Sequence, residues 1–230
     1  MQDIEINRTN HMRNNGTVIT IAQQKGGAGK TTLASHLAIA LCQKKNRVAV
    51  LDIDPQGSLT HWYHIRSERF GEDYTGIFFT NTSGWKINSE LSSLKSQYDY
   101  IIIDSPPHVE TDAKSAIRAS DLVLIPVQPS PTDIWATKAT VELCNSEKIE
   151  NLIVINRVTH NSKLADEVTK AFKKNVCKTQ ISNRVAFASS LLEGRCVMET
   201  QPKGPASDEI KALVSEVLAK LSAKNKKKAA

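Results

Sequence analysis

A glycine-rich loop with two lysines is the segment of this chain whose residue types and spacing best fit a defined chemistry. Residues 25 to 32 read Lys25-Gly26-Gly27-Ala28-Gly29-Lys30-Thr31-Thr32. In an ordinary phosphate-binding loop, Gly-x-x-x-x-Gly-Lys-Ser/Thr, backbone N–H groups surround the phosphates, the lysine reaches the β/γ oxygens and the hydroxyl binds Mg²⁺. Here Gln24 occupies the first glycine position, and Lys25 follows it. The loop therefore departs from the ordinary pattern by one residue and carries a second lysine.

The loop still offers the groups that bind a nucleoside triphosphate. Its backbone N–H groups would lie at the start of a helix, where the helix dipole also favours anions. Lys30 is expected to neutralise the β and γ phosphates, Thr31 to bind Mg²⁺ and Thr32 to contact the α-phosphate. The predicted ligands are therefore ATP or ADP with Mg²⁺. The predicted contacts within the loop are made by Gly26, Gly27, Ala28, Gly29, Lys30, Thr31 and Thr32.

Two aspartates that follow apolar runs add the remaining chemistry of an ATPase. Transfer of a phosphoryl group to water depends mostly on positioning and charge neutralisation, so such an enzyme also needs a residue that holds the attacking water. Asp104 is predicted to hold Mg²⁺ through a water molecule, and Asp54 to orient the attacking water. The predicted metal-site residues are Thr31, Asp54 and Asp104. A single aspartate at a strand end more often caps a turn. Two of them beside a phosphate loop indicate Mg²⁺-dependent hydrolysis of ATP to ADP and phosphate.

The elements that must position these residues follow from hydrophobic patterns. Continuous apolar runs predict buried strands, helix-period segments lie between them, and residues 60–85 show no clear pattern. Strands that are apolar on both faces and alternate with helices indicate a parallel sheet covered on both sides. The predicted strands are residues 18–22, 48–51, 100–103, 122–126 and 152–156, and the predicted helices are residues 31–44, 86–97, 112–119, 132–146 and a C-terminal helix that begins at Ser207.

This pattern predicts a single-domain α/β fold of the P-loop NTPase type, with a mostly parallel twisted sheet and helices on both faces. In such sheets, ligands bind at the carboxyl ends of the strands. Asp54, Asp104, Asn156 and the phosphate loop all follow predicted strands, so we expect them at the same edge.

The length of 230 residues suits one such domain and is short for two. We assign residues 17–222 to the domain. We expect residues 1–16 to be a disordered N-terminal tail and residues 223–230 to be a disordered basic tail, because both segments are polar or rich in lysine.

Positive charge is concentrated in the last third of the chain. Residues 1–150 contain 15 Lys and Arg against 17 Asp and Glu, whereas residues 151–230 contain 15 against 7. Such a basic sector suggests an anionic partner, either nucleic acid or acidic lipid. The alternative is that these charged side chains form a hydrated surface that binds no partner. The polar side of the C-terminal helix mixes Glu216 with Lys211 and Lys220, which favours docking on the domain over binding at a membrane surface.

Cysteine spacing and the absence of long apolar runs indicate a cytoplasmic protein. Cys42, Cys144, Cys177 and Cys196 contain no Cys-x-x-Cys pair, which fits reduced thiols. The first residues lack the apolar run of a signal peptide, and no stretch approaches the ~20 apolar residues of a membrane span.

Four segments resemble a known family of ATPases. Lys-Gly-Gly-x-Gly-Lys-Thr resembles the deviant Walker A motif of the ParA/MinD family of dimerising ATPases, and the resemblance extends over about residues 17 to 221. The other matching segments are Asp52-Ile53-Asp54-Pro55-Gln56-Gly57-Ser58, which is similar to switch I of ParA-type partition ATPases, residues 102–107, which are similar to their switch II, and residues 121–133, which resemble short plasmid-partition members.

The resemblance implies a DNA partition or segregation ATPase. In this family two ATP-bound chains form a homodimer with the nucleotides sandwiched between them. Lys25 would then contact the phosphates of the partner chain, Asp54 would be the residue needed for hydrolysis, and Asn156 and Arg157 fall where the family contacts adenine. The catalytic set is thus Lys25, Lys30 and Asp54, and Lys25, Asp104, Asn156 and Arg157 join the nucleotide-binding set.

The resemblance also implies two macromolecular partners. ATP-bound dimers of this kind bind double-stranded DNA without sequence preference, and a ParB-like centromere-binding protein would stimulate the slow hydrolysis that releases them. The expected location is therefore the cytoplasm, on the nucleoid. The basic residues nearest the family's DNA-contacting positions are Lys173, Lys174, Lys178, Arg184, Arg195 and Lys203.

Other functions within the same fold are weighed against this one. A MinD-like ATPase would act at a membrane surface through a basic amphipathic end, but the run after Ala223 contains no large apolar residue. A redox relative would need cysteines paired across a dimer, and neither Cys177 nor Cys196 lies in a paired motif. The cargo, whether a plasmid, the chromosome or a protein cluster, and polymerisation beyond a dimer are left open.

Overall fold

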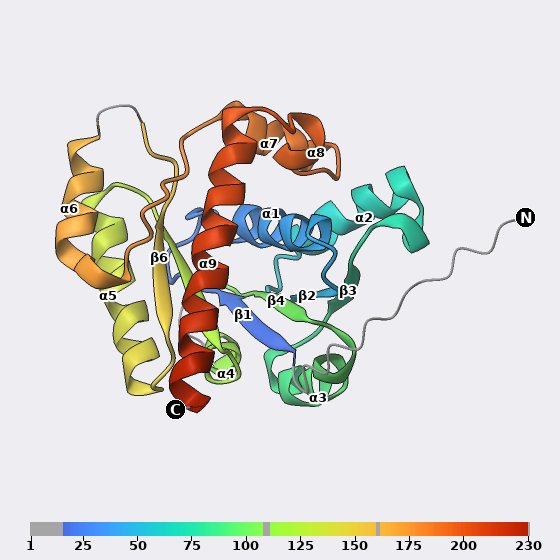
Figure 1. The fold of residues 1–230 in the computed structure, drawn as a ribbon, viewed down its shortest axis with the longest axis horizontal. Helices are drawn as coiled ribbons and strands as arrows, with labels where there is room; N and C mark the ends of the chain where they lie inside the picture. The colour runs from blue at the N-terminus through green and yellow to red at the C-terminus, as the bar shows by residue number, and fades with distance from the viewer. Residues whose placement is uncertain (1–15, 108–110, 160–161, 230) are drawn as a thin grey trace, which may run out of the picture.

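A six-stranded parallel sheet forms the centre of the molecule (Figure 1). The computed structural model describes residues 16–107, 111–159 and 162–229, so the predicted N-terminal tail lies outside the described residues except for Gly16. The strands are β1 (Thr17–Ile21), β2 (Val48–Asp52), β3 (Phe78–Asn81), β4 (Tyr100–Asp104), β5 (Leu122–Val127) and β6 (Asn151–Ile155). Their order is β3-β2-β4-β1-β5-β6, and every neighbouring pair is parallel. The predicted fold class is confirmed.

Strand register brings the chemically important loops together. β4 lies between β1 and β2, and Asp104 at its end is level with Ile21 on one side and with Asp52 on the other. β2, β4, β5 and β6 are buried at every position, as expected for apolar strands covered on both faces. The phosphate loop, which follows β1, therefore emerges beside the carboxylates that end β2 and β4.

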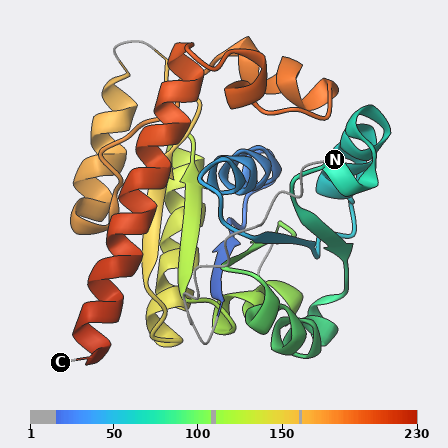
Figure 2. The same cartoon turned by 45° about the vertical axis from the view of Figure 1, so that its right-hand side comes forward.

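Helices cover both faces of the sheet (Figures 1 and 2). One face packs against α1 (Lys30–Gln43), α2 (Ser58–Phe70), α7 (Val185–Leu192), α8 (Val197–Thr200) and α9 (Pro205–Ala229). The other face packs against α3 (Ile87–Gln97), α4 (Thr111–Arg118), α5 (Pro131–Ser146) and α6 (Lys163–Phe172). Within the described residues, three short 3₁₀ helices complete the elements, η1 (Glu72–Tyr74), η2 (Gly84–Lys86) and η3 (Lys173–Asn175).

The five predicted strands are present, but β3 was not predicted. β3 has only four residues, pairs only with β2, and is partly exposed along its length. A short edge strand of this kind shows neither a buried run nor strict alternation, so its pattern is weak. Helices α2, α6, α7 and α8 also lie in segments for which no helix was predicted.

The boundaries of α9 differ from the prediction at both ends. The helix begins at Pro205 instead of Ser207, because proline is pre-organised for the first helical position and the Gly204 carbonyl accepts from Asp208 N–H at 3.1 Å. At its other end α9 continues to Ala229, so the predicted disordered tail from residue 223 is corrected over the described residues. Alanine and lysine are strong helix formers, and lysines near a helix C-terminus complement its dipole.

The apolar side of α9 is docked on the domain. Ile210, Leu213, Val214, Val217 and Leu221 are at most 7% exposed and belong to the core cluster formed with α1 and the sheet. The predicted docking of this helix is confirmed. Within the described ranges, no helix combines the length and apolar character that spanning a membrane requires.

Candidate active site

A cavity of about 520 Å³ opens at the carboxyl edge of the sheet and collects most of the predicted site residues. The predicted residues that line it are Gly26, Gly27, Gly29, Lys30, Thr31, Thr32, Asp54 and Arg157. They come from the loop after β1, the loop after β2 and the end of β6, and the parallel topology brings these loops to one edge.

The phosphate loop adopts a backbone shape that requires glycine. Gly27 and Gly29 have φ of 77° and 98°, in the left-handed region. A side chain at Gly29 would also place its Cβ 2.3 Å from Asn156 Nδ2. The loop therefore turns sharply into α1 and leaves its N–H groups at the N-terminus of a 14-residue helix.

Two amides from distant segments support this loop from outside. Asn156 Nδ2 donates to the Ala28 carbonyl at 2.8 Å, and Gln128 Nε2 donates to the Gly27 carbonyl at 2.7 Å. Asn156 Oδ1 accepts from Arg157 N–H at 3.0 Å. Asn156 thus holds the loop, its predicted contact with adenine stays a prediction, and Gln128 is a supporting residue that sequence reasoning missed.

Lys30, Asp54 and Asp104 place buried charge at the base of the cavity. Their exposed fractions are 7%, 9% and 1%. Burial lowers the pKa of Lys30, while the negative charges of Asp104 and Asp54 act in the opposite direction. Burial raises the pKa of Asp104 to about 8; the Thr31 hydrogen bond lowers it, and the neighbouring Asp52 raises it further. One lysine among carboxylates in a water-poor site is suited to neutralising phosphate charge.

Thr31 and Asp104 fit a magnesium ion. Thr31 Oγ1 donates to Asp104 Oδ2 at 2.7 Å, and Asp104 Oδ1 is a buried oxygen that receives no hydrogen bond from any described residue. The described residues contain no cluster of three His, Cys, Asp or Glu side chains that could hold a metal alone. Mg²⁺ is usually bound by one or two protein groups together with phosphate oxygens and water, and this donor set matches that arrangement.

Asp54 is held in a preformed turn that lines the cavity. Its Oδ1 accepts from Gln56 N–H at 3.0 Å, and its own N–H donates to Asp52 Oδ1 at 3.1 Å. Asp52 also accepts from the backbone and hydroxyl of Thr60 on α2, at 2.8 and 2.7 Å. Asp52 is therefore a structural residue that fixes the loop, and Asp54 is the carboxylate that faces the cavity.

Lys25 is held by its own chain and does not line the cavity. Its Nζ forms an ion pair with Asp133 Oδ2 at 2.5 Å and donates to Thr132 Oγ1 at 3.0 Å, both in the first turn of α5. The Lys25 side chain is 40% exposed, whereas that of Asp133 is 1% exposed. Within one chain, Lys25 is therefore anchored away from the phosphate cavity, and its predicted action on the partner chain stays a prediction.

The cavity has an apolar wall that sequence reasoning missed. Trp62 and Ile65 on α2 and Leu191 and Leu192 on α7 line it, together with Gln56, Ser58, His61 and Pro107. α2 follows the Asp54 loop directly, so its residues could have been predicted to line the cavity. α7 lies more than 100 residues further along the chain, and no local pattern indicates its approach.

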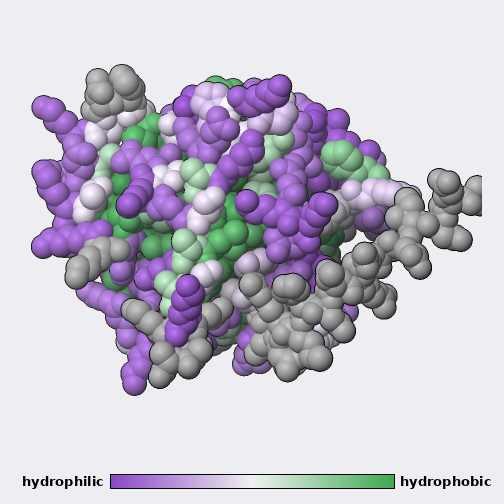
Figure 3. Space-filling view, viewed as in Figure 1, coloured by the Kyte–Doolittle hydropathy of each residue, from purple (hydrophilic) through white to green (hydrophobic). Residues whose placement is uncertain are grey.

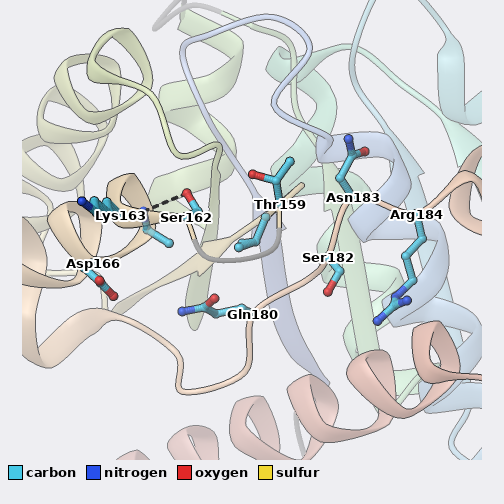
Figure 4. A pocket seen from close by; sticks show the side chains of 10 residues that line it. Thr159, Ser162, Lys163, Asp166, Gln180, Ser182, Asn183 and Arg184 are labelled. Atoms are coloured by element: carbon cyan, nitrogen blue, oxygen red, sulfur yellow. Dashed lines mark hydrogen bonds between the residues drawn. The ribbon is translucent and has the colours of Figure 1, made fainter.

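A second, polar cavity of about 920 Å³ lies beyond Arg157. In Figure 4, Lys163 and Asp166 on α6 lie on one side of this cavity, and Ser182, Asn183 and Arg184 on the segment that leads into α7 lie on the other. The segment runs beside the end of β6, since Asn183 N–H donates to the Val158 carbonyl at 2.9 Å. Arg157 and Val158 are consecutive, so the two cavities meet at this strand end.

The predicted DNA-contacting residues are spread over several elements. Lys173 lies in η3, Lys178 follows it, Arg184 precedes α7, Arg195 lies between α7 and α8, and Lys203 lies between α8 and α9. Arg184 pairs with Glu209 at 2.8 Å and Arg195 with Glu193 at 3.3 Å. Lys173, Lys178 and Lys203 are exposed, and the side chain of Lys174 lies outside the described part of the chain. The face with α6 and α9 is mostly hydrophilic, with hydrophobic residues showing between the polar ones (Figure 3).

The fold and cavity define a P-loop α/β protein with a nucleotide site at the sheet edge. The family model for the CobQ/CobB/MinD/ParA nucleotide binding domain matches residues 19–197. The chain therefore belongs to this family, and it is a ParA/MinD-type ATPase. The resemblance inferred from the loop and the switch segments is confirmed.

Individual relatives agree with this assignment. The chain is 27% identical over 215 residues to maintenance of carboxysome distribution protein A of Halothiobacillus neapolitanus, covering 89% of this chain and 98% of that one. It is 26% identical over 253 residues to sporulation initiation inhibitor protein Soj of Bacillus subtilis, covering 89% and 99%. Among solved structures, MinD of Pyrococcus horikoshii with Mg-ADP has a TM-score of 0.76 at 20% identity, covering 88% and 96%. The Cyanothece McdA(D38A)-ATP complex has a TM-score of 0.74 at 20% identity, covering 89% and 97%; at this identity both structures show the fold alone.

Proposed function

We propose that this ATPase is a DNA partition ATPase that binds DNA as an ATP-bound homodimer and leaves it when a partner protein stimulates hydrolysis. The observation that carries the proposal is the single cavity on which Lys30, Thr31 and Asp54 converge, with Asp104 bonded to Thr31 at its base. These are the groups that ATP hydrolysis requires, and the sequence predicted each of them.

The chain's own residues account for each step of the reaction. The N–H groups of the phosphate loop would bind the phosphates, Lys30 would neutralise the β and γ oxygens, and Thr32 would contact the α-phosphate. Thr31 and Asp104 would hold Mg²⁺, which would supply neutralisation of phosphate charge. Asp54, which lines the cavity, would orient the attacking water. The adenine base of the nucleotide would extend past Arg157 toward the polar cavity.

Dimerisation gives Lys25 its role in the proposed cycle. Lys25 sits beside the site with 40% of its side chain exposed, and its ion pair with Asp133 and its hydrogen bond to Thr132 hold it on its own chain. Because the side chain of Asp133 is only 1% exposed, this pair is held more firmly than an exposed one, and charge-assisted hydrogen bonds to a phosphate of the second chain would have to replace it. We propose that ATP-dependent dimerisation moves Lys25 from Asp133 to the partner's nucleotide.

DNA and a centromere-binding partner complete the proposal. Support comes from the basic last third of the chain and from relatives named for chromosome partition, such as ParA of Myxococcus xanthus. A ParB-like protein bound to the cargo would stimulate hydrolysis, and the chain would act on the nucleoid in the cytoplasm. The name of the Halothiobacillus relative refers to carboxysomes, so the cargo is either a replicon or a protein body. Membrane binding is disfavoured, because the apolar side of α9 is already buried in the core.

ATP hydrolysis with and without DNA, in wild type and Lys25→Ala, tests the proposal. We expect the wild type to be stimulated by DNA with a partner protein, and the variant to bind ATP but lose the stimulated rate. Normal, stimulated hydrolysis by the variant would refute the dimer mechanism. Flotation with anionic vesicles in the presence of ATP tests the alternative. Recovery of the protein with vesicles but not with DNA would mean that a membrane surface, and not DNA, is its partner.

A further inference from the structure

His36 is a fully buried histidine that joins two distant elements at the nucleotide site. It lies on α1 one turn after Thr32, is 0% exposed, and packs its ring against Phe187 on α7 at 5.2 Å between centroids. Its Nδ1 lies 2.7 Å from the Thr32 carbonyl oxygen, and Val197 N–H donates to its Nε2 at 3.2 Å. Both ring nitrogens are therefore occupied by backbone groups.

The two bonds fix the tautomer of the ring. A neutral imidazole has one donor and one acceptor nitrogen. Because the Val197 N–H is a donor, Nε2 must be the acceptor, and the proton lies on Nδ1 and is donated to the Thr32 carbonyl. Burial lowers the pKa of His36 to about 4, which keeps the ring in this neutral form at ordinary pH.

The carbonyl that receives this proton belongs to the first turn of α1. Lys30, Thr31 and Thr32 make up that turn, and Ser35 Oγ also donates to the Thr32 carbonyl at 3.0 Å. At the other side of the ring, Val197 is the first residue of α8. The imidazole therefore connects the turn that carries the phosphate-binding side chains to the N-terminus of α8.

The segment around the start of α8 also contacts α2, the helix that follows Asp54. Glu199 on α8 forms a bidentate ion pair with Arg66 on α2, at 2.8 and 2.9 Å, and accepts from Cys196 N–H at 2.8 Å. Arg66 is 4% exposed and also donates to the Gly194 carbonyl at 3.0 Å. A side chain at Gly194 would place its Cβ 2.4 Å from Arg66 N, so this corner is closely fitted to α2. The corner, residues 193–199, is thus a fixed point against which both α1 and α2 are held.

We propose that His36 is a positioning residue for ATP: its Nδ1–H holds the first turn of α1, and with it Lys30, Thr31 and Thr32, in the geometry that binds the phosphates. The proposal rests on the nucleotide site described under the proposed function. The bond to Thr32 sets this geometry directly, whereas the bond to Val197 anchors the ring to α8.

Two conservative variants separate the two bonds. In His36→Asn the side-chain amide nitrogen takes the place of Nδ1 and reaches the Thr32 carbonyl, but nothing replaces Nε2. In His36→Gln the amide oxygen takes the place of Nε2 and accepts from Val197, but nothing replaces Nδ1. Each variant keeps one hydrogen bond and loses the other, so their losses of stability should be alike, and His64→Asn on the exposed side of α2 is the matched control.

The measurements are the Kd for a fluorescent ATP analogue with Mg²⁺, the KM and kcat for ATP, and the thermal midpoint without nucleotide, all on the full chain. We expect His36→Asn and His64→Asn to bind within about threefold of wild type, and His36→Gln to bind about tenfold more weakly with a raised KM, as a lost buried bond predicts. Equal affinity of His36→Gln and wild type would overturn the positioning role. A wild type without affinity for the nucleotide would instead overturn the proposed function, and the inference with it.

Discussion

The nucleotide site and the basic last third of the chain hold their charged residues in opposite ways. Lys30 and Asp104 are buried, Lys30 feels the negative charge of Asp104, and the two residues lie 74 positions apart in the sequence. In the last third, Lys173, Lys178 and Lys203 are exposed, and they lie in η3, in the segment after it and in the loop between α8 and α9. Strand register and burial fix the positions of the site residues. The exposed lysines are fixed only by the segments of backbone that carry them across the surface.

The difference shows which kind of sequence signal locates a function. A motif at strand ends predicts positions, because parallel strands deliver their carboxyl ends to one edge of the sheet. An excess of charge predicts a kind of partner but no particular contact, because exposed lysines are compatible with many positions. The ion pairs of Arg184 and Arg195 show further that some of the predicted basic residues already have acidic neighbours.

Replacement of Lys30 tests the buried side of this comparison and should have the largest effect. Lys30→Ala removes the cation placed to neutralise the β and γ phosphates, so we expect kcat/KM for ATP to fall about 100-fold or more. Hydrolysis assays and the thermal shift produced by Mg-ATP measure the loss. Lys44→Ala, an exposed lysine at the opposite end of α1, is the control and should behave as wild type. Equal loss in both variants would mean that the position of Lys30 carries no special role.

Acid should destabilise the protein through His36. The pKa of His36 is about 4 when folded, against 6.5 for an ordinary histidine, so the unfolded chain binds the proton more tightly. Stability from this residue is complete above about pH 7 and is lost as the pH falls toward 4, by about 3 kcal/mol at most. Glu199 faces the ring and partly offsets the effect of burial on its pKa.

Urea unfolding of wild type and His36→Asn between pH 7.5 and 5 measures this contribution. Asp104 acts in the opposite sense, because its raised pKa of about 8 means that the folded state gains stability as Asp104 becomes protonated. The difference between the two proteins isolates His36, since both retain Asp104. We expect the stability advantage of the wild type over the variant to shrink as the pH falls; a constant difference between them would contradict a neutral, buried His36.

Charge reversal of the exposed lysines tests the other side of the comparison. The triple change of Lys173, Lys178 and Lys203 to Glu should weaken ATP-dependent binding to random duplex DNA by about tenfold or more and reduce its salt slope by about three. Gel or filter binding over a range of salt concentrations measures both quantities. Lys86, Lys95 and Lys114, changed together to Glu, provide a control of equal charge outside the last third. A similar loss in both triples would show that net charge, and no particular surface, governs binding.

Release of Lys25 should have the smallest effect. Asp133→Asn removes the ion pair that holds Lys25 on its own chain, so ATP-dependent dimerisation should strengthen about two- to fivefold, as expected for a half-exposed pair. Analytical ultracentrifugation in ATP measures the dimer dissociation constant. Asp208→Asn makes the same change of side chain in a longer, exposed pair with Lys211, at 3.7 Å in the first turn of α9, and serves as control. Weaker dimerisation of Asp133→Asn would mean that Asp133 supports the interface instead of restraining Lys25.

The sequence by itself determined the fold class, five of the strands and the residues at the base of the site. Apolar runs, glycines at special φ and carboxylates at strand ends are local signals, and the rule for parallel sheets converts them into a place. The edge strand β3 and helices α7 and α8 carry weaker local signals, so they appeared only in the structure.

Only the tertiary structure decided how the site is supported. The amide of Asn156 against the phosphate loop, the ion pair of Lys25 with Asp133, and His36 between Thr32 and Val197 all join residues at least 100 positions apart. Hydrogen bonds and ion pairs of this kind depend on distances of about 3 Å, which the packing of helices on the sheet sets and local sequence does not encode. Local motifs therefore identify the residues that carry the chemistry, and the tertiary fold sets the contacts that hold them in place.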